Sequence, residues 1–160
     1  KLSVVNRIDL EYFLNSILTP LFPETTSEEL LAAVAIAART NLYYLAANPK
    51  NTYWAINGKD INYLGYKTTG NSDSIMDAIH MTRYMVLGKN NAYEGVVDPI
   101  LAEWQIPGLL NVKGGRQVLS KIDIAEGKRL AAKGDNAAQI LKKAFPEATI
   151  QLIQTSPGAI

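Results

Sequence analysis

Apolar residues recur at helical spacing in two stretches near the start of the chain. The first predicts a helix over residues 10–18, which ends at Pro20 because proline disfavours a helical conformation in the residue before it. Thr26 and Glu29 then have the spacing of a capping box, in which each side chain satisfies a backbone amide at a helix start. The second stretch predicts a long helix over residues 27–47. Its buried face is expected to carry Leu30, Leu31, Val34, Ala38, Leu42 and Leu45.

Shorter patterns lie on both sides of these two helices. Residues 2–6 alternate enough to predict a short strand. The mixture of Tyr, Trp, Ile, Asn and Gly over residues 51–70 predicts short strands and turns. Ser72 is expected to cap a helix over residues 73–84, because serine side chains accept hydrogen bonds from the first amides of a helix. Residues 85–87 then predict a strand.

The last part of the chain is expected to be mainly helical. Residues 93–115 carry two prolines and four glycines, which indicates a loop-rich stretch. A helix is predicted over residues 120–133, where Gly134 supplies the residue type that commonly ends helices. A second helix over residues 135–145 and a closing strand over residues 148–153 follow.

Together these patterns predict an α+β fold in one domain, with a long central helix, short strands and two C-terminal helices. The domain spans residues 1–153, and residues 154–160 form a tail. The chain has 160 residues, the usual size of a single domain, and shows no internal repeat or linker. Its hydrophobic share of 48% is that of a globular domain and excludes a disordered chain.

Charge and cysteine content exclude several classes of function. The 16 basic and 15 acidic residues give a net charge of +1 and are scattered, which disfavours nucleic-acid binding. The chain has no cysteine, which excludes thiol nucleophiles, disulfides and cysteine zinc sites. His80 is the one histidine, so we expect neither a metal nor a cofactor. We see no apolar run near the roughly 18 residues that span a membrane and expect no transmembrane segment. No signal peptide is visible before Lys1 either, which suggests a processed start or an excised domain.

Residues 10–40 carry a longer pattern without gaps. Leu10-Glu11 opens the first helix with Phe13 two positions later, Leu21-Phe22-Pro23 follows it, and residues 29–35 precede Ala37-Ala38-Arg39-Thr40. This order resembles the SpoIID/LytB family of bacterial cell-wall domains. The family has Leu-Glu-x-Tyr, Glu-Met-Pro, Glu-Ala-Leu-Lys-Ala-Gln-Ala and Ala-Ala-Arg-Thr at these places. Weaker similarity continues over residues 78–87, where Tyr84 replaces a family glycine, and in the C-terminal helices.

The resemblance implies a chemistry that this chain lacks at its centre. Family members that cleave glycans are lytic transglycosylases of peptide-stripped peptidoglycan, and one carboxylic acid protonates the glycosidic oxygen and then acts as the base. Leu21 stands where that acid is expected, and an aliphatic side chain cannot transfer a proton. Glu24, three residues later, is the nearest candidate for a relocated acid. The family's His-Cys-Gln segment and its glycine-rich loop are also missing, at residues 59–63 and 117–124.

Two interpretations remain open for each candidate binding residue. Arg39 is either a buried arginine that pairs with an acid and backbone carbonyls, or a groove residue that contacts glycan hydroxyls or a carboxylate. Trp54, Tyr63 and Tyr66 are the aromatic candidates for stacking on sugars, and such residues are as often core packing. They belong to a run of six aromatics over residues 43–66.

The leading hypothesis is therefore an acid-less, SpoIID/LytB-like domain that binds peptidoglycan glycan strands or modulates a cell-wall amidase or other hydrolase. The resemblance implies an extracytoplasmic location, in the cell envelope or periplasm. One alternative is an active lytic transglycosylase that uses Glu24, and another is a protein–protein scaffold without a glycan groove.

Overall fold

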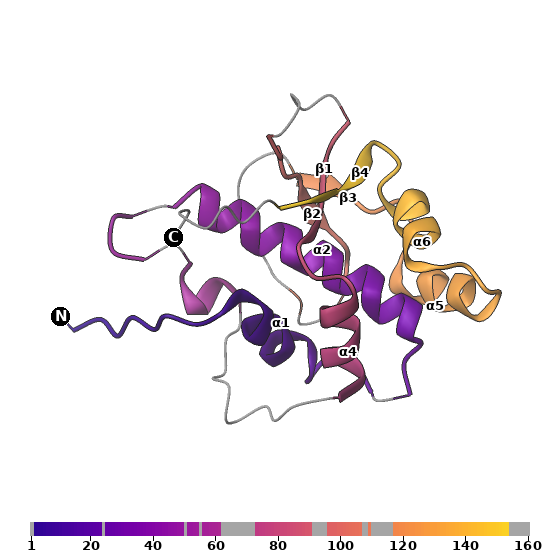
Figure 1. The fold of residues 1–160 in the computed structure, drawn as a ribbon, viewed down its shortest axis with the longest axis horizontal. Helices are drawn as coiled ribbons and strands as arrows, with labels where there is room; N and C mark the ends of the chain where they lie inside the picture. Colours follow the sequence, from indigo (N-terminus) through magenta and orange to yellow (C-terminus); the bar gives the residue numbers. More distant parts are fainter. Residues whose placement is uncertain are drawn as a thin grey trace.

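The computed structural model describes residues 2–23, 25–49, 51–54, 56–61, 73–90, 96–106, 109 and 117–153. Its helices are α1 (Leu10–Leu18), α2 (Glu28–Ala47), the short 3-10 helix η1 (Gly58–Ile61), α4 (Asp73–Met81), α5 (Ile124–Ala132) and α6 (Ala137–Ala144). Its strands are β1 (Met85–Lys89), β2 (Leu101–Glu103), β3 (Gln117–Leu119) and β4 (Ala148–Leu152). This is the predicted α+β architecture (Figure 1).

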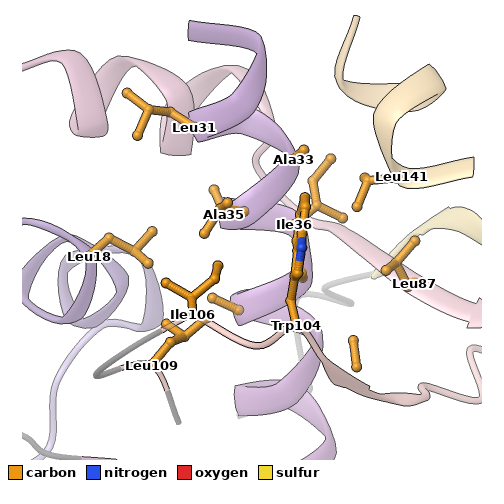
Figure 2. Packing of buried hydrophobic residues seen from close by; sticks show 14 of the residues in the cluster. Leu18, Leu31, Ala33, Ala35, Ile36, Leu87, Trp104, Ile106, Leu109 and Leu141 are labelled. Atoms are coloured by element: carbon orange, nitrogen blue, oxygen red, sulfur yellow. The ribbon is translucent and has the colours of Figure 1, made fainter. Parts of the chain in front are cut away.

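The long helix α2 is the centre of the domain, and α1, α4, α5, α6, β1 and β2 all pack against it (Figure 1). Every residue from Leu30 to Leu42 is buried, as expected for a helix that is apolar on all sides. Figure 2 shows that side chains on more than the predicted face of α2 are buried. Leu31, Ala33, Ala35 and Ile36 of α2 meet side chains from different elements, among them Leu18, Trp104 and Leu141.

The same helix passes a simple length and composition test for a membrane span. Its mean hydropathy reaches 1.4 over an 18-residue window. However, 72% of that window is buried inside the domain, and core helices of globular proteins pass the same test. Most of the apolar surface of α2 is therefore covered by the packing of the domain itself.

Two small sheets lie beside α2. Strands β1 and β4 are antiparallel and pair Met85 with Leu152 and Leu87 with Ile150, so the predicted closing strand is present. Strands β2 and β3 are parallel and pair Leu101 with Gln117. Both lie in or beside the stretch that proline and glycine content predicted to be loop, because strands of three residues are too short to leave a periodic pattern.

The helix boundaries follow the predicted caps in part. α1 occupies the predicted residues, and Asp9 caps it by accepting a hydrogen bond from the amide of Glu11 at 2.9 Å. Gly134 has a φ of 101°, the left-handed conformation in which glycine ends a helix at little cost. α5 begins at Ile124 rather than residue 120, because Asp123 accepts the capping bond from the amide of Glu126.

Two local predictions were wrong. Residues 2–6 form no strand, and Leu2 is 94% exposed, since alternation alone makes no strand without a partner strand to pair with. The capping box of Thr26 and Glu29 is also absent. The Thr26 hydroxyl donates to the Pro23 carbonyl at 2.6 Å. The Glu29 carboxylate instead accepts a hydrogen bond from the Ala137 amide at 2.8 Å, at the start of α6, where Asn136 is the N-cap. The predicted cap Ser72 lies outside the described residues.

Candidate functional site

Arg39 lies on the central helix α2 with no solvent exposure. Its Nε donates to Glu11 Oε1 at 2.9 Å and its Nη2 donates to Glu11 Oε2 at 2.7 Å. This two-point geometry matches the planar guanidinium to a carboxylate and fixes α1 on α2. Glu11 is itself buried, so each charge neutralises the other away from water.

The remaining donors of Arg39 reach backbone carbonyls where α4 ends and β1 begins. Nη2 donates to the Ile79 carbonyl at 3.1 Å, and Nη1 donates to the carbonyls of Thr82 at 2.7 Å and Met85 at 3.0 Å. The Thr82 carbonyl also accepts from the Met85 amide at 2.9 Å, and the Ile79 carbonyl also accepts from the Thr82 hydroxyl at 3.3 Å, so Arg39 adds a second donor to each of these two groups. All five N–H groups of Arg39 therefore have acceptors within the domain. This arrangement is the first of the two interpretations, and in it the guanidinium has no surface for a glycan.

The two residues after Arg39 fasten two further strands to α2. The Thr40 hydroxyl accepts a hydrogen bond from the Leu87 amide of β1 at 2.7 Å. The Asn41 side chain accepts from the Ala102 amide of β2 and donates to the Ala102 carbonyl, both at 2.7 Å. The end of the Ala-Ala-Arg-Thr segment, with Asn41 after it, is therefore where α1, α4, β1 and β2 are joined to the central helix.

The turn that Arg39 holds contains an unusual backbone conformation. Tyr84 has a φ of 67°, in the left-handed region that residues with a Cβ adopt at a cost. This is the position at which the sequence comparison with SpoIID/LytB domains expected glycine, which adopts this conformation freely. Arg83 lies over the Tyr84 ring at 4.9 Å from its centroid, a cation–π contact that accompanies the tyrosine.

Leu21, at the expected position of the acid, lies in the turn that follows α1. Its amide donates to the Leu18 carbonyl at 3.0 Å, and its side chain is half-buried against the core beside the buried Phe22. Glu24, the candidate for a relocated acid, lies outside the described residues. A shallow hollow of about 180 Å³ between α6 and β4 is lined mainly by apolar side chains and includes none of the predicted site residues.

Of the aromatic candidates, the structure describes Trp54 and leaves Tyr63 and Tyr66 outside the described residues. Trp54 is half-buried in the segment after α2. Tyr53 belongs to the run of six aromatics over residues 43–66 but was not among the three candidates. It is 80% exposed, and its ring lies 6.4 Å from that of Trp54. The segment that contains both follows the end of a long helix, which is the signal that could have drawn attention to Tyr53.

The ionisable residues elsewhere form no metal centre in the part of the chain that the structure describes. His80 is exposed on α4, and no group of three or more His, Asp or Glu side chains lies close enough together there to hold an ion. On the exposed surface of α5, a hydrogen bond from Arg129 lowers the pKa of Glu126. This pair is a surface contact within one helix, remote in sequence from the site residues.

Glu11 is buried, and the predictions from the sequence gave it no role. Its position beside Leu10 and before Phe13 and Leu14, on the apolar side of a short helix, was the available signal. A carboxylate at such a position needs a buried cation, and Arg39 is that cation.

Comparison with known proteins supports the resemblance. A family model described as SpoIID, Stage II sporulation protein, matches residues 1–88, which is more than half of the chain. An uncharacterized protein of Chlamydia muridarum is 29% identical over 96% of this chain and 46% of its own length. An uncharacterized protein of Chlamydia pneumoniae is 29% identical over 95% of this chain and 48% of its own length. The chain thus spans about half the length of these relatives. No solved structure matches.

Proposed function

Because this chain belongs to the SpoIID (Stage II sporulation protein) family, we propose that it is a peptidoglycan-associated domain that binds glycan strands without cleaving them. The family points to a peptidoglycan-related role at the cell envelope. The finer proposal, binding without cleavage, concerns the residues of this chain.

Leu21 is the observation that carries the proposal. Cleavage of a glycosidic bond requires a group that can donate a proton to the leaving oxygen, typically a carboxylic acid. In the register of the family motif that group is replaced by Leu21, whose side chain packs against the core. General acid–base help is typically worth about 10² to 10⁴ in rate, so turnover without it falls steeply.

The retained part of the family motif favours a domain that kept its scaffold. Arg39, Thr40 and Asn41 use buried hydrogen bonds to hold four other elements on α2. These contacts need no carboxylate at position 21. A sequence can therefore lose the acid and keep the surfaces that the scaffold positions, and such a domain can still hold glycan.

The proposed location is extracytoplasmic, where glycan strands are found. A cell-wall amidase or another hydrolase is the protein partner that fits this role, with the domain holding the strand on which the partner acts.

The test pairs binding with cleavage. The parent chain should sediment with insoluble peptidoglycan and release no anhydro-ended products from peptide-stripped glycan. Cleavage by the parent would overturn the proposal, and Glu24→Gln would then show whether the acid has moved to Glu24. Failure of the folded parent to sediment with peptidoglycan would favour a protein–protein scaffold. Leu21→Glu serves as the matched variant. Activity in this variant alone would show that the groove persists and that only the acid was lost.

A further inference from the structure

Tyr53, which is exposed, and Trp54, which is half-buried, form an aromatic pair in the segment that follows α2 in the sequence. Their ring planes are inclined by 37°, with the centroids 6.4 Å apart. Tyr53 is the most exposed aromatic residue in the described part of the chain, at 80%. Tyr84 is another exposed tyrosine, and the Arg83 guanidinium lies over its ring. The Tyr84 ring therefore contacts a cation, whereas the Tyr53 ring lies beside another aromatic ring.

The pair is held by its own segment rather than by the core. Asn51 Oδ1 accepts hydrogen bonds from the amide of Tyr53 at 2.8 Å and from the amide of Trp54 at 3.0 Å. These two bonds hold the backbone of both aromatic residues to the Asn51 side chain. The rings are therefore presented by a defined turn, which lowers the entropy cost of ordering them when a ligand stacks on them.

The segment that carries the rings suits a ligand with an apolar face and polar edges. The sequence from Asn51 to Gly58 contains no charged residue. Thr52 precedes and Asn57 follows the pair in the sequence, and both are exposed. The Thr52 hydroxyl and the Asn57 amide nitrogen can form hydrogen bonds with hydroxyl and N-acetyl groups. A sugar ring has an apolar face that stacks on an aromatic ring and a polar rim that meets such groups. Lys50 and Lys59 border this uncharged segment in the sequence, and Lys59 is exposed.

We infer that Tyr53 and Trp54 are a stacking site for a glycan, with Asn51 as the residue that positions both rings. The inference rests on the proposed function and deepens it, because it names where a strand binds. In the sequence the site follows α2, whereas Leu21 precedes it.

Sedimentation with peptidoglycan and titration with peptide-stripped glycan test the inference on the whole chain. Tyr53→Ala and Trp54→Ala should each weaken binding about tenfold. Tyr53→Phe should bind like the parent, because the stacking face is kept. Asn51→Ala should weaken binding less than either ring deletion, at an unchanged melting temperature. Tyr12→Ala is the matched control, since it removes another exposed tyrosine on α1 and should leave binding unchanged.

Tryptophan fluorescence supplies an independent readout, because the chain has two tryptophans and Trp104 is buried. Glycan should shift the emission of the parent and leave that of Trp54→Ala unchanged. If the parent binds glycan but both alanine variants bind equally well, the stacking site is wrong and the proposed function stands. If the parent binds intact peptidoglycan but not peptide-stripped glycan, the ligand is peptide and the inference fails. If the folded parent binds neither, both proposals fail.

Discussion

The carboxylate of Glu11 and the guanidinium of Arg39, 28 residues apart in sequence, form a buried two-point ion pair between α1 and α2, with distances of 2.9 and 2.7 Å. The pair joins the first helix of the family motif to its Ala-Ala-Arg-Thr segment. Because Arg39 also satisfies carbonyls of α4 and β1, one side chain holds three parts of the fold together.

Removal of either partner of this pair should be strongly destabilising. Glu11→Gln and Arg39→Ala should each lower the free energy of unfolding by about 3–5 kcal/mol, because the other charge is left buried without its partner. Chemical denaturation measures this effect. Peptidoglycan binding by Arg39→Ala should remain in proportion to its folded fraction. A variant that stays as stable as the parent and loses binding would show that Arg39 contacts the glycan.

Thr40→Val should destabilise the domain although the two side chains have nearly the same shape. The substitution leaves the buried amide of Leu87 without its acceptor, at a cost of about 1–3 kcal/mol. Thr26→Val is the control, because the Thr26 hydroxyl bond to Pro23 is exposed and its loss should change stability little. Equal unfolding midpoints for the two variants would contradict the role assigned to Thr40.

Tyr84→Gly should be more stable than Tyr84→Ala by about 1 kcal/mol. Both variants lose the aromatic ring and its contact with Arg83, but only glycine removes the cost of the left-handed backbone at φ 67°. Because both variants lack the ring, the difference between their thermal unfolding midpoints reports the cost of the left-handed backbone alone. Equal stability would mean that the turn relaxes to another conformation in solution.

The purified domain should hold no stoichiometric zinc. The chain has no cysteine and one histidine, and the described part of it shows no cluster of ligating side chains. A chelator should leave the melting temperature unchanged, because a metal that stabilises only the folded state would lower it on removal. Zinc near one equivalent after dialysis would refute this expectation.

Local sequence patterns were sufficient for features that depend on neighbouring residues. α1 was predicted from the spacing of Leu10, Phe13, Leu14 and Ile17, since these residues share one helix face. Gly134 was predicted as a helix end because its conformation is set by its own backbone. The resemblance of residues 10–40 to the SpoIID/LytB motif likewise needs only order and spacing, and the match of the SpoIID family model to residues 1–88 confirms the family.

The choice of side-chain partners depended on the tertiary structure. From the sequence, Glu29 was a cap for its own helix, but packing brings the start of α6, 108 residues away, within 2.8 Å of its carboxylate. Arg39 could be a groove residue or a core residue until Glu11 and the end of α4 were placed around it. The physical reason is the same in both cases. Helix periodicity reports which face of a helix is apolar, whereas the partner of a buried charge or a cap is set by which distant element folding brings against that face.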